Sequence, residues 1–69
     1  MLLPIWTIFD HPLDYPDKFV ARLFFCDQPT RHVLVSGNIE SLRRVFGEKG
    51  LTCMKRSEHD DANIVESWL

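Results

Sequence analysis

The chain has 69 residues, of which 45% are hydrophobic and 26% are charged, a balance typical of a folded domain and not of a disordered segment. Its formal net charge of -2 and its pI of about 5.8 give no overall attraction to nucleic acid or to an anionic membrane. A chain of this length forms one small domain, residues 1–69, with a stability of about 3–5 kcal/mol, so self-association would be a natural way to gain stability.

The N-terminus contains many apolar residues but lacks the features of a targeting or membrane segment. Pro4 and Asp10 interrupt the apolar run and no basic residues precede it. The run is also far shorter than the roughly 20 residues that a membrane span needs. We therefore expect a cytoplasmic protein with no membrane partner. In that compartment Cys26 and Cys53, each on a predicted strand, are expected to be free thiols in the core.

The first predicted strand covers residues 4–9, where apolar residues occur on both faces and Pro4 is acceptable only at the beginning. Prolines and aspartates then prevent regular pairing over residues 10–18. We expect this connection to be held against the core by Leu13 and Tyr15.

The most apolar and aromatic-rich run is residues 19–26, which is too short for a typical helix and predicts the central strand of the domain. Residues 27–30 predict a turn around Pro29, and residues 32–36 predict a short strand that completes a hairpin. Strand alternation over the central strand separates a face interrupted by Arg22 from a purely apolar face. We expect the apolar face to meet the core; it consists of Phe19, Ala21, Leu23 and Phe25.

A helix is predicted over residues 38–47, because Asn38 is a good N-cap and Gly47 can supply a left-handed stop. Residues 51–55 predict a fourth strand, and residues 56–63 predict a polar loop. The apolar face of the helix consists of Ile39, Leu42, Val45 and Phe46.

Residues 64–69 fit either a strand or a helix. As a strand they place Ile64, Glu66 and Trp68 on one face and Val65, Ser67 and Leu69 on the other. As a helix capped at Asp61 they group Ile64, Val65, Trp68 and Leu69. We favour the strand, because so short a segment rarely sustains a helix and the Ile-Val pair prefers a pleated backbone.

Together these segments predict an α+β domain with the order β-β-β-α-β-β, a mainly antiparallel sheet and one helix packed on one face. A single helix leaves the second face of the sheet uncovered. We expect that uncovered face to carry Trp6, Ile8, Val20, Phe24 and Cys26.

Two stretches carry a family resemblance: residues 14–22 read DYPDKFVAR, and residues 60–69 read DDANIVESWL. They resemble a group of small bacterial proteins, some of them in prophages, that have a tyrosine-proline start to an FVAR strand and a terminal IVE-x-WL. In that group a proline often follows the acidic pair, where this chain has Ala62 and Asn63. The resemblance implies a small, self-contained, cytoplasmic protein and transfers no activity.

The side chains that could form a metal or nucleophile site are few: His11, His32, His59, Cys26, Cys53, Asp60 and Asp61. No pair has the spacing of metal ligands, and the glycines match no phosphate-binding loop. No histidine lies close in sequence to Cys26 to activate it. Residues 59–61 are better explained as a solvated turn. We expect no catalytic residue, no cofactor and no metal, and thus a protein that is not an enzyme.

The uncovered face predicts a small protein–protein interaction or adaptor protein, which binds a second copy as a homodimer or binds a host protein. The candidate partner-binding residues are Trp6, Arg22, Phe24, Arg43, Arg44 and Trp68. The tryptophans have a second interpretation as core rings, and the paired arginines have one as the solvent face of the helix. The alternative function is a nucleic-acid-binding regulator that uses Arg22, Arg43, Arg44, Lys55 and Arg56.

Overall fold

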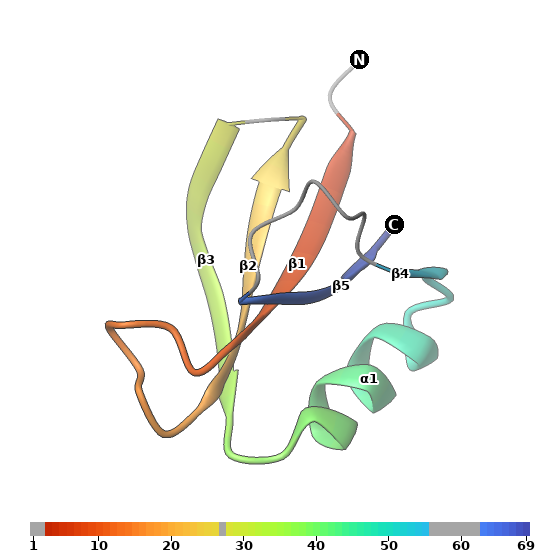
Figure 1. The fold of residues 1–69 in the computed structure, drawn as a ribbon. Coiled ribbons are helices and arrows are strands. Elements are labelled where there is room, and N and C mark those ends of the chain that lie inside the picture. Colours follow the sequence, from red (N-terminus) through yellow and green to blue (C-terminus); the bar gives the residue numbers. More distant parts are fainter. Residues whose placement is uncertain (1–2, 27, 56–62) are drawn as a thin grey trace.

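The computed structural model describes residues 3–26, 28–55 and 63–69, which form five strands and one helix. The elements are β1 (Pro4–Asp10), β2 (Phe19–Phe25), β3 (Gln28–Ser36), α1 (Ile39–Glu48), β4 (Cys53–Lys55) and β5 (Ile64–Trp68) (Figure 1). The predicted α+β class and the order β-β-β-α-β-β are confirmed.

The strands form one antiparallel sheet in the order β3-β2-β1-β5-β4. The prediction that residues 19–26 form the central strand is wrong, because the C-terminal strand β5 pairs with the far side of β1 and places β1 in the centre. β2 is nevertheless an interior strand between β1 and β3. Ile8, in the middle of β1, pairs with Ala21 on one side and with Glu66 on the other.

β3 begins earlier than the sequence predicted. Gln28 and Pro29 already pair with the end of β2, so the predicted turn at residues 27–30 is wrong for its last three residues; Asp27 lies outside the described part of the chain. Proline is tolerated here because β3 is at the edge of the sheet. A register shift follows, where the Thr30 hydroxyl donates to the Leu23 carbonyl oxygen at 2.7 Å.

The helix starts where the sequence predicted and ends later. The Asn38 side chain accepts a hydrogen bond from the Glu40 amide at 2.9 Å, which satisfies one of the free N–H groups of the first turn. Gly47 is not the predicted stop, because it lies inside α1 and the backbone remains right-handed through Lys49. The left-handed residue is Gly50, with φ of 78°.

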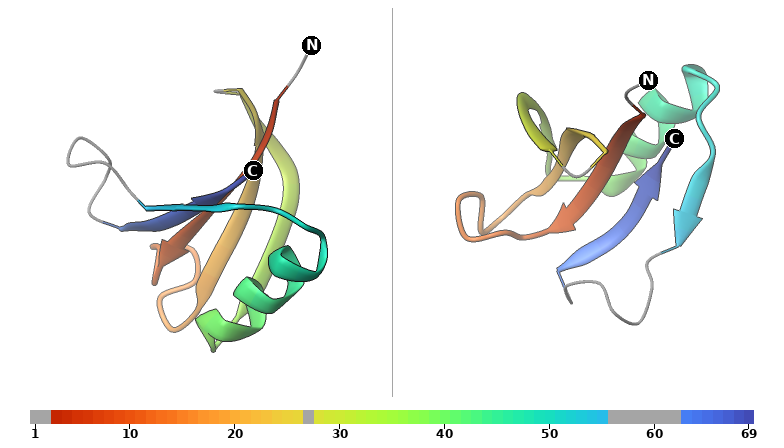
Figure 2. Two further views of the ribbon diagram at one scale, coloured as in Figure 1. Left: turned by 90° about the vertical axis from the view of Figure 1, so that its right-hand side faces the viewer. Right: turned by 90° about the horizontal axis from the view of Figure 1, so that it is seen from above.

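The helix lies against one face of the sheet (Figure 2), and the core fills the space between them. Phe46 of α1 is fully buried, and its ring centroid lies 5.3 Å from that of Trp6 and 5.8 Å from that of Trp68. The buried residues of this core cluster are Ile8, Ala21, Leu42 and Phe46. The prediction that Trp6 and Ile8 lie on the uncovered face is therefore wrong, because both belong to the helix-covered face.

The apolar face predicted for β2 meets the core only in part. Phe19 packs against the core cluster and Ala21 belongs to it, whereas Leu23 is half-buried and lies outside it. Phe25 is also only half-buried, at the end of β2. Because the core is centred on Phe46 of α1, the half of β2 that begins at Phe19 contributes more side chains to the core than the other half.

The connection between β1 and β2 is held by its own hydrogen bonds and not by the predicted anchors. Leu13 is 99% exposed and Tyr15 is also exposed. The Tyr15 amide donates to the Pro12 carbonyl at 2.9 Å, and the Lys18 amide donates to the Tyr15 carbonyl at 3.2 Å. Two consecutive turns therefore give the loop its shape without core contacts from either predicted anchor.

Both cysteines are free thiols, but neither is in the core as predicted. Cys26 follows β2 in a left-handed conformation with φ of 57°, and Cys53 lies on the short edge strand β4; both residues are exposed. The fourth strand is also shorter than predicted, because residues 51 and 52 precede it. The predicted polar loop at residues 56–63 lies outside the described residues except for Asn63.

The C-terminal segment is a strand, as the sequence favoured. The side chains of β5 do not follow the predicted alternation, because the strand contains a bulge. Ile8 pairs with Glu66 and the next residue, Phe9, pairs with Ile64, so Val65 is an extra residue between the two pairs. Val65 therefore packs against the core, while Ile64 lies on the opposite side of the sheet with Ser67. Glu66 and Trp68 remain together on the helix-covered face.

Candidate interaction surface

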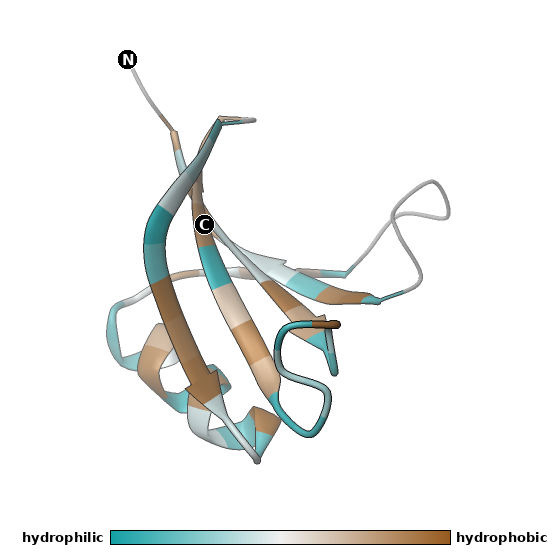
Figure 3. Ribbon diagram, turned by 90° about the vertical axis from the view of Figure 1, so that its left-hand side faces the viewer, coloured by the Kyte–Doolittle hydropathy of each residue, from teal (hydrophilic) through white to brown (hydrophobic). Residues whose placement is uncertain are grey.

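The face of the sheet opposite α1, here called the open face, is largely apolar. Strand alternation places odd-numbered residues of β1 and even-numbered residues of β2 on it. Figure 3, in which the helix lies behind the sheet, shows hydrophobic segments on neighbouring strands. The open face thus includes Ile5, Thr7, Phe9, Val20, Arg22, Phe24, Val33 and Val35.

A hollow of about 430 Å³ lies on the open face. Its volume is within the range of about 300–1,000 Å³ found for ligand-binding pockets. Among the described residues, its lining includes the hydroxyls of Thr7 and Ser67 and the Cys26 thiol, and no charged side chain. The lining residues are Ile5, Thr7, Phe9, Phe24, Cys26, Ile64 and Ser67.

The loop between β1 and β2 contacts the open face through a side chain of β2. The Arg22 side chain on β2 contacts the Asp14 side chain in the loop, which holds the loop on this side of the sheet. Val20, adjacent on the same face, is fully buried although the helix lies on the other side. The apolar part of the face that remains accessible to solvent lies around the hollow and at Val35 of β3.

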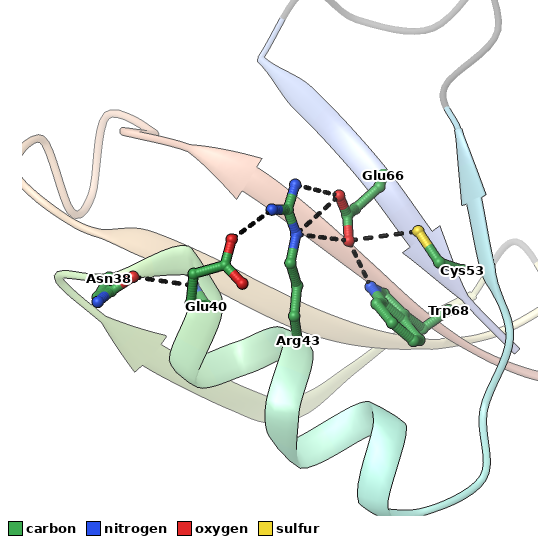
Figure 4. A network of polar contacts seen from close by, with 6 residues as sticks. All are labelled: Asn38, Glu40, Arg43, Cys53, Glu66 and Trp68. Carbon is green, nitrogen blue, oxygen red and sulfur yellow. Dashed lines mark hydrogen bonds and ion pairs between the residues drawn. The ribbon is translucent and has the colours of Figure 1, made fainter.

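The helix-covered face contains a polar network centred on Glu66, which is only 5% exposed (Figure 4). The Arg43 guanidinium on α1 donates from Nη2 to Glu66 Oε1 at 2.8 Å, and from Nη1 to Glu40 Oε1 at 2.6 Å. The Trp68 indole N–H donates to Glu66 Oε2 at 2.7 Å, and the Cys53 thiol lies 3.4 Å from the same oxygen. Both carboxylate oxygens of Glu66 are therefore satisfied.

The contacts within this network shift the pKa of three of its side chains, those of Glu66, Arg43 and Cys53. Burial alone would raise the pKa of Glu66, but hydrogen bonds from Arg43, Trp68 and Cys53 outweigh it, and the pKa lies below its usual value. The hydrogen bond to Glu66, followed by the one to Glu40, raises the pKa of Arg43. Local desolvation of the sulfur, although the residue as a whole is exposed, and the hydrogen bond to the Glu66 carboxylate raise the pKa of the Cys53 thiol. A thiol with a raised pKa is a poor nucleophile at neutral pH, so the network joins α1 to β5 and does not activate Cys53.

The six candidate partner-binding residues do not form one surface. Arg22 and Phe24 lie on the open face, whereas Trp6 and Trp68 pack against Phe46 on the other face. Arg43 is paired with two carboxylates, of Glu40 and Glu66, and so is not simply a residue of the solvent face of the helix. Arg44 is exposed on the helix.

The basic residues of the nucleic-acid alternative are also divided between the faces. Arg22 on the open face contacts Asp14, and Arg43 on the other side of the sheet contacts Glu66. Lys55 lies on β4, and its pairing with Glu66 places it on the helix-covered face. Arg56 lies outside the described residues. Arg22 therefore lies on a different face from Arg43 and Lys55, and the described residues of this set do not share one face.

Sequence reasoning missed most of the hollow and the buried carboxylate. Strand alternation over residues 4–9 gives two sets of side chains. Ile5, Thr7 and Phe9 line the hollow, but Trp6 and Ile8 are equally apolar, and the sequence pattern alone assigned those two to the open face. The local sequence around Glu66 contains no sign of burial, since its charged partner Arg43 is on the helix.

Within the described ranges, no group of three or more His, Cys, Asp or Glu side chains could hold a metal ion. Residues 59–61, considered above as a metal candidate, are outside those ranges. In the same part of the chain, no helix is both long enough and apolar enough to cross a membrane. Comparisons of the chain with protein-family models, with curated proteins and with solved structures found no match.

Proposed function

We propose that the protein is a small non-catalytic interaction module that binds an apolar segment of a partner protein in the hollow on its open face. The observation that carries the proposal is the hollow itself, formed by side chains of β1, β2 and β5 on a face that the helix does not cover. Apolar surface that a folded domain leaves uncovered in one place is a known mark of an interaction site.

The character of the lining supports a protein partner. Apolar and aromatic side chains dominate the hollow, and the Thr7 and Ser67 hydroxyls could accept or donate hydrogen bonds to a bound backbone. Aromatic and aliphatic anchors inserted into such hollows account for much of the affinity of protein interfaces. Charge pairing contributes little, because Arg22 is already in contact with Asp14.

The same proposal includes a cytoplasmic location. The fold leaves Cys26 and Cys53 unpaired, which supports this location because stable disulfides are common outside the cell and rare in the cytosol. A mass measurement of the protein purified from its own cells, with and without reductant, would test this part: two unmodified thiols are expected.

The binding proposal is tested by selecting peptides from a random displayed library on the immobilised protein. We expect enriched peptides to share an aromatic or large aliphatic anchor. Ser67→Leu fills the hollow with an apolar side chain, so it should raise the dissociation constant of a selected peptide at least tenfold. The free energy of unfolding should stay level or rise, because the added side chain is apolar.

Ser41→Leu is the matched control, because Ser41 is exposed on α1 on the other side of the sheet. It should leave the affinity for the peptide unchanged. A library that yields no common anchor, or a Ser67→Leu variant that binds as tightly as the Ser41→Leu variant, would contradict the proposal.

A further inference from the structure

β3 is an edge strand with nine residues, while the opposite edge strand, β4, has three. An edge strand presents unpaired backbone N–H and C=O groups that can pair with another strand. β3 is therefore the longer of the two free edges, and it forms the margin of the sheet in Figure 3.

The hydrogen bonds identify which backbone groups of β3 point away from the sheet. The His32 amide donates to the Thr30 hydroxyl at 3.1 Å, and that hydroxyl donates to the Leu23 carbonyl of β2, so the His32 amide points toward β2. Backbone groups alternate in direction along a strand. The N–H and C=O groups of Val33 and Val35 therefore point outward, and those of Leu34 point toward β2.

Natural sheets protect their edges with short strands, prolines, bulges and exposed charges. The first half of β3 has such protection, namely Pro29, the register shift that follows it, and the exposed Arg31. β4 is protected by its length and by Lys55. The second half of β3 has none of these features, and Figure 3 shows its change from hydrophilic to hydrophobic along the strand.

We propose that β3 pairs with β3 of a second copy of this chain, antiparallel and around a two-fold axis at Leu34. The segment Val33-Leu34-Val35 reads the same in both directions, so the two-fold axis places Val33 of each copy opposite Val35 of the other. Both residues have outward backbone groups, and such opposed residues exchange both of their N–H···O bonds in an antiparallel pair. Closed two-fold pairing is also the commonest symmetry of homo-oligomers.

Side chains on both faces agree with this pairing. Val33 and Val35 lie on the open face, and Val35 is 42% exposed, so opposed valines would cover apolar surface that one copy leaves in water. Leu34 lies on the other face, packed against the core of its own copy. The two sheets would join into one continuous sheet, with the two open faces side by side and both hollows free.

Hydrogen exchange measured by NMR at low and high protein concentration tests the pairing directly. The Val33 and Val35 amides should exchange fast when the protein is dilute and become protected as the concentration rises. The Leu34 amide, which is bonded within the sheet, should be protected at both concentrations and serves as the internal control. Sedimentation over micromolar to millimolar concentration should show an 8.1 kDa monomer converting to a dimer.

Val35→Lys adds the charge that protects natural edges, so it should raise the dimer dissociation constant at least tenfold. Val45→Lys makes the same change at an exposed position on α1 and should leave the dimer unaffected.

A monomer at all concentrations would overturn the inference. So would a dimer in which the Val33 and Val35 amides still exchange fast. Because the hollow does not include Val35, selected peptides should still bind the Val35→Lys monomer, which separates this inference from the proposed function.

Discussion

Replacing Phe46 tests whether the core is centred on the helix-covered face. Phe46 is fully buried between Trp6 and Trp68 and within a cluster that includes Ile8. Truncating such a residue to alanine costs about 3–5 kcal/mol. That cost is similar to the whole stability of a domain of this size, so Phe46→Ala would leave no folded state to measure.

Phe46→Leu keeps an apolar side chain and removes the ring contacts, which are worth about 0.5–1.5 kcal/mol beyond the buried area. A small cavity adds to this cost, so we expect a loss of about 1–3 kcal/mol in the free energy of unfolding. Phe24→Leu is the matched control: Phe24 is half-buried on the open face and lies outside the core cluster, so its loss should be below about 1 kcal/mol.

Urea unfolding followed by tryptophan fluorescence suits this comparison, because both tryptophans pack on the Phe46 ring and report its surroundings. A loss of less than about 0.5 kcal/mol for Phe46→Leu, or a loss no larger than that of Phe24→Leu, would show that the core is not centred on Phe46.

Four further predictions concern the network and the charges. Because hydrogen bonds lower the pKa of Glu66 in the folded protein, its stabilising effect is complete above the unfolded pKa of about 4.3 and is lost as the pH falls through the lower folded value. Urea melts below pH 4.3 should therefore show a steeper loss of stability for the wild type than for Glu66→Gln; equal slopes would contradict this. Arg43→Ala leaves the Glu66 carboxylate with fewer partners, so it should lower the free energy of unfolding by about 1–3 kcal/mol. Because the guanidinium is partly exposed and screened by solvent, we expect a loss in the lower part of this range. Arg44→Ala should change the free energy of unfolding by less than about 0.5 kcal/mol. A larger loss for Arg44→Ala than for Arg43→Ala would show that the network contributes little to stability. Cys53, whose pKa is raised, should react with iodoacetamide at pH 8 more slowly in the folded than in the urea-unfolded protein; faster reaction when folded would indicate an activated thiol. Binding to random nucleic acid at physiological salt should be no tighter than the non-specific range of about 10⁻⁴–10⁻⁶ M, and tight binding in fluorescence anisotropy that is lost in the Arg43→Ala/Arg44→Ala variant would restore the nucleic-acid alternative.

Local patterns in the sequence were sufficient for the elements and their order. The Asn38 cap, the apolar helix face around Leu42 and Phe46, and Pro4 at the start of β1 are signals within a few residues of one another, and the structure contains each of them. The short Ile-Val segment at the C-terminus was likewise recognised as a strand from its composition. These features depend on backbone preferences that neighbouring residues determine.

The errors concern choices that distant residues determine. Both faces of β1 are apolar, so its alternation could not decide whether Trp6 or Ile5 faces the helix; the contact with Phe46 decides it. The burial of Glu66 requires Arg43 of the helix, and the bulge beside it moves Ile64 to the open face. The central position of β1 likewise depends on pairing with β5, at the other end of the chain.

The proposed function requires that the hollow on the open face binds an apolar segment of another protein. The most direct measurement is an NMR titration of isotope-labelled protein with a library-selected peptide, following every backbone amide. The largest shift changes should occur at the residues around the hollow in β1, β2 and β5, with Thr7 and Ser67 among them, and the amides of α1 should change little. Shift changes centred on α1, or spread evenly over the chain, would contradict the claim.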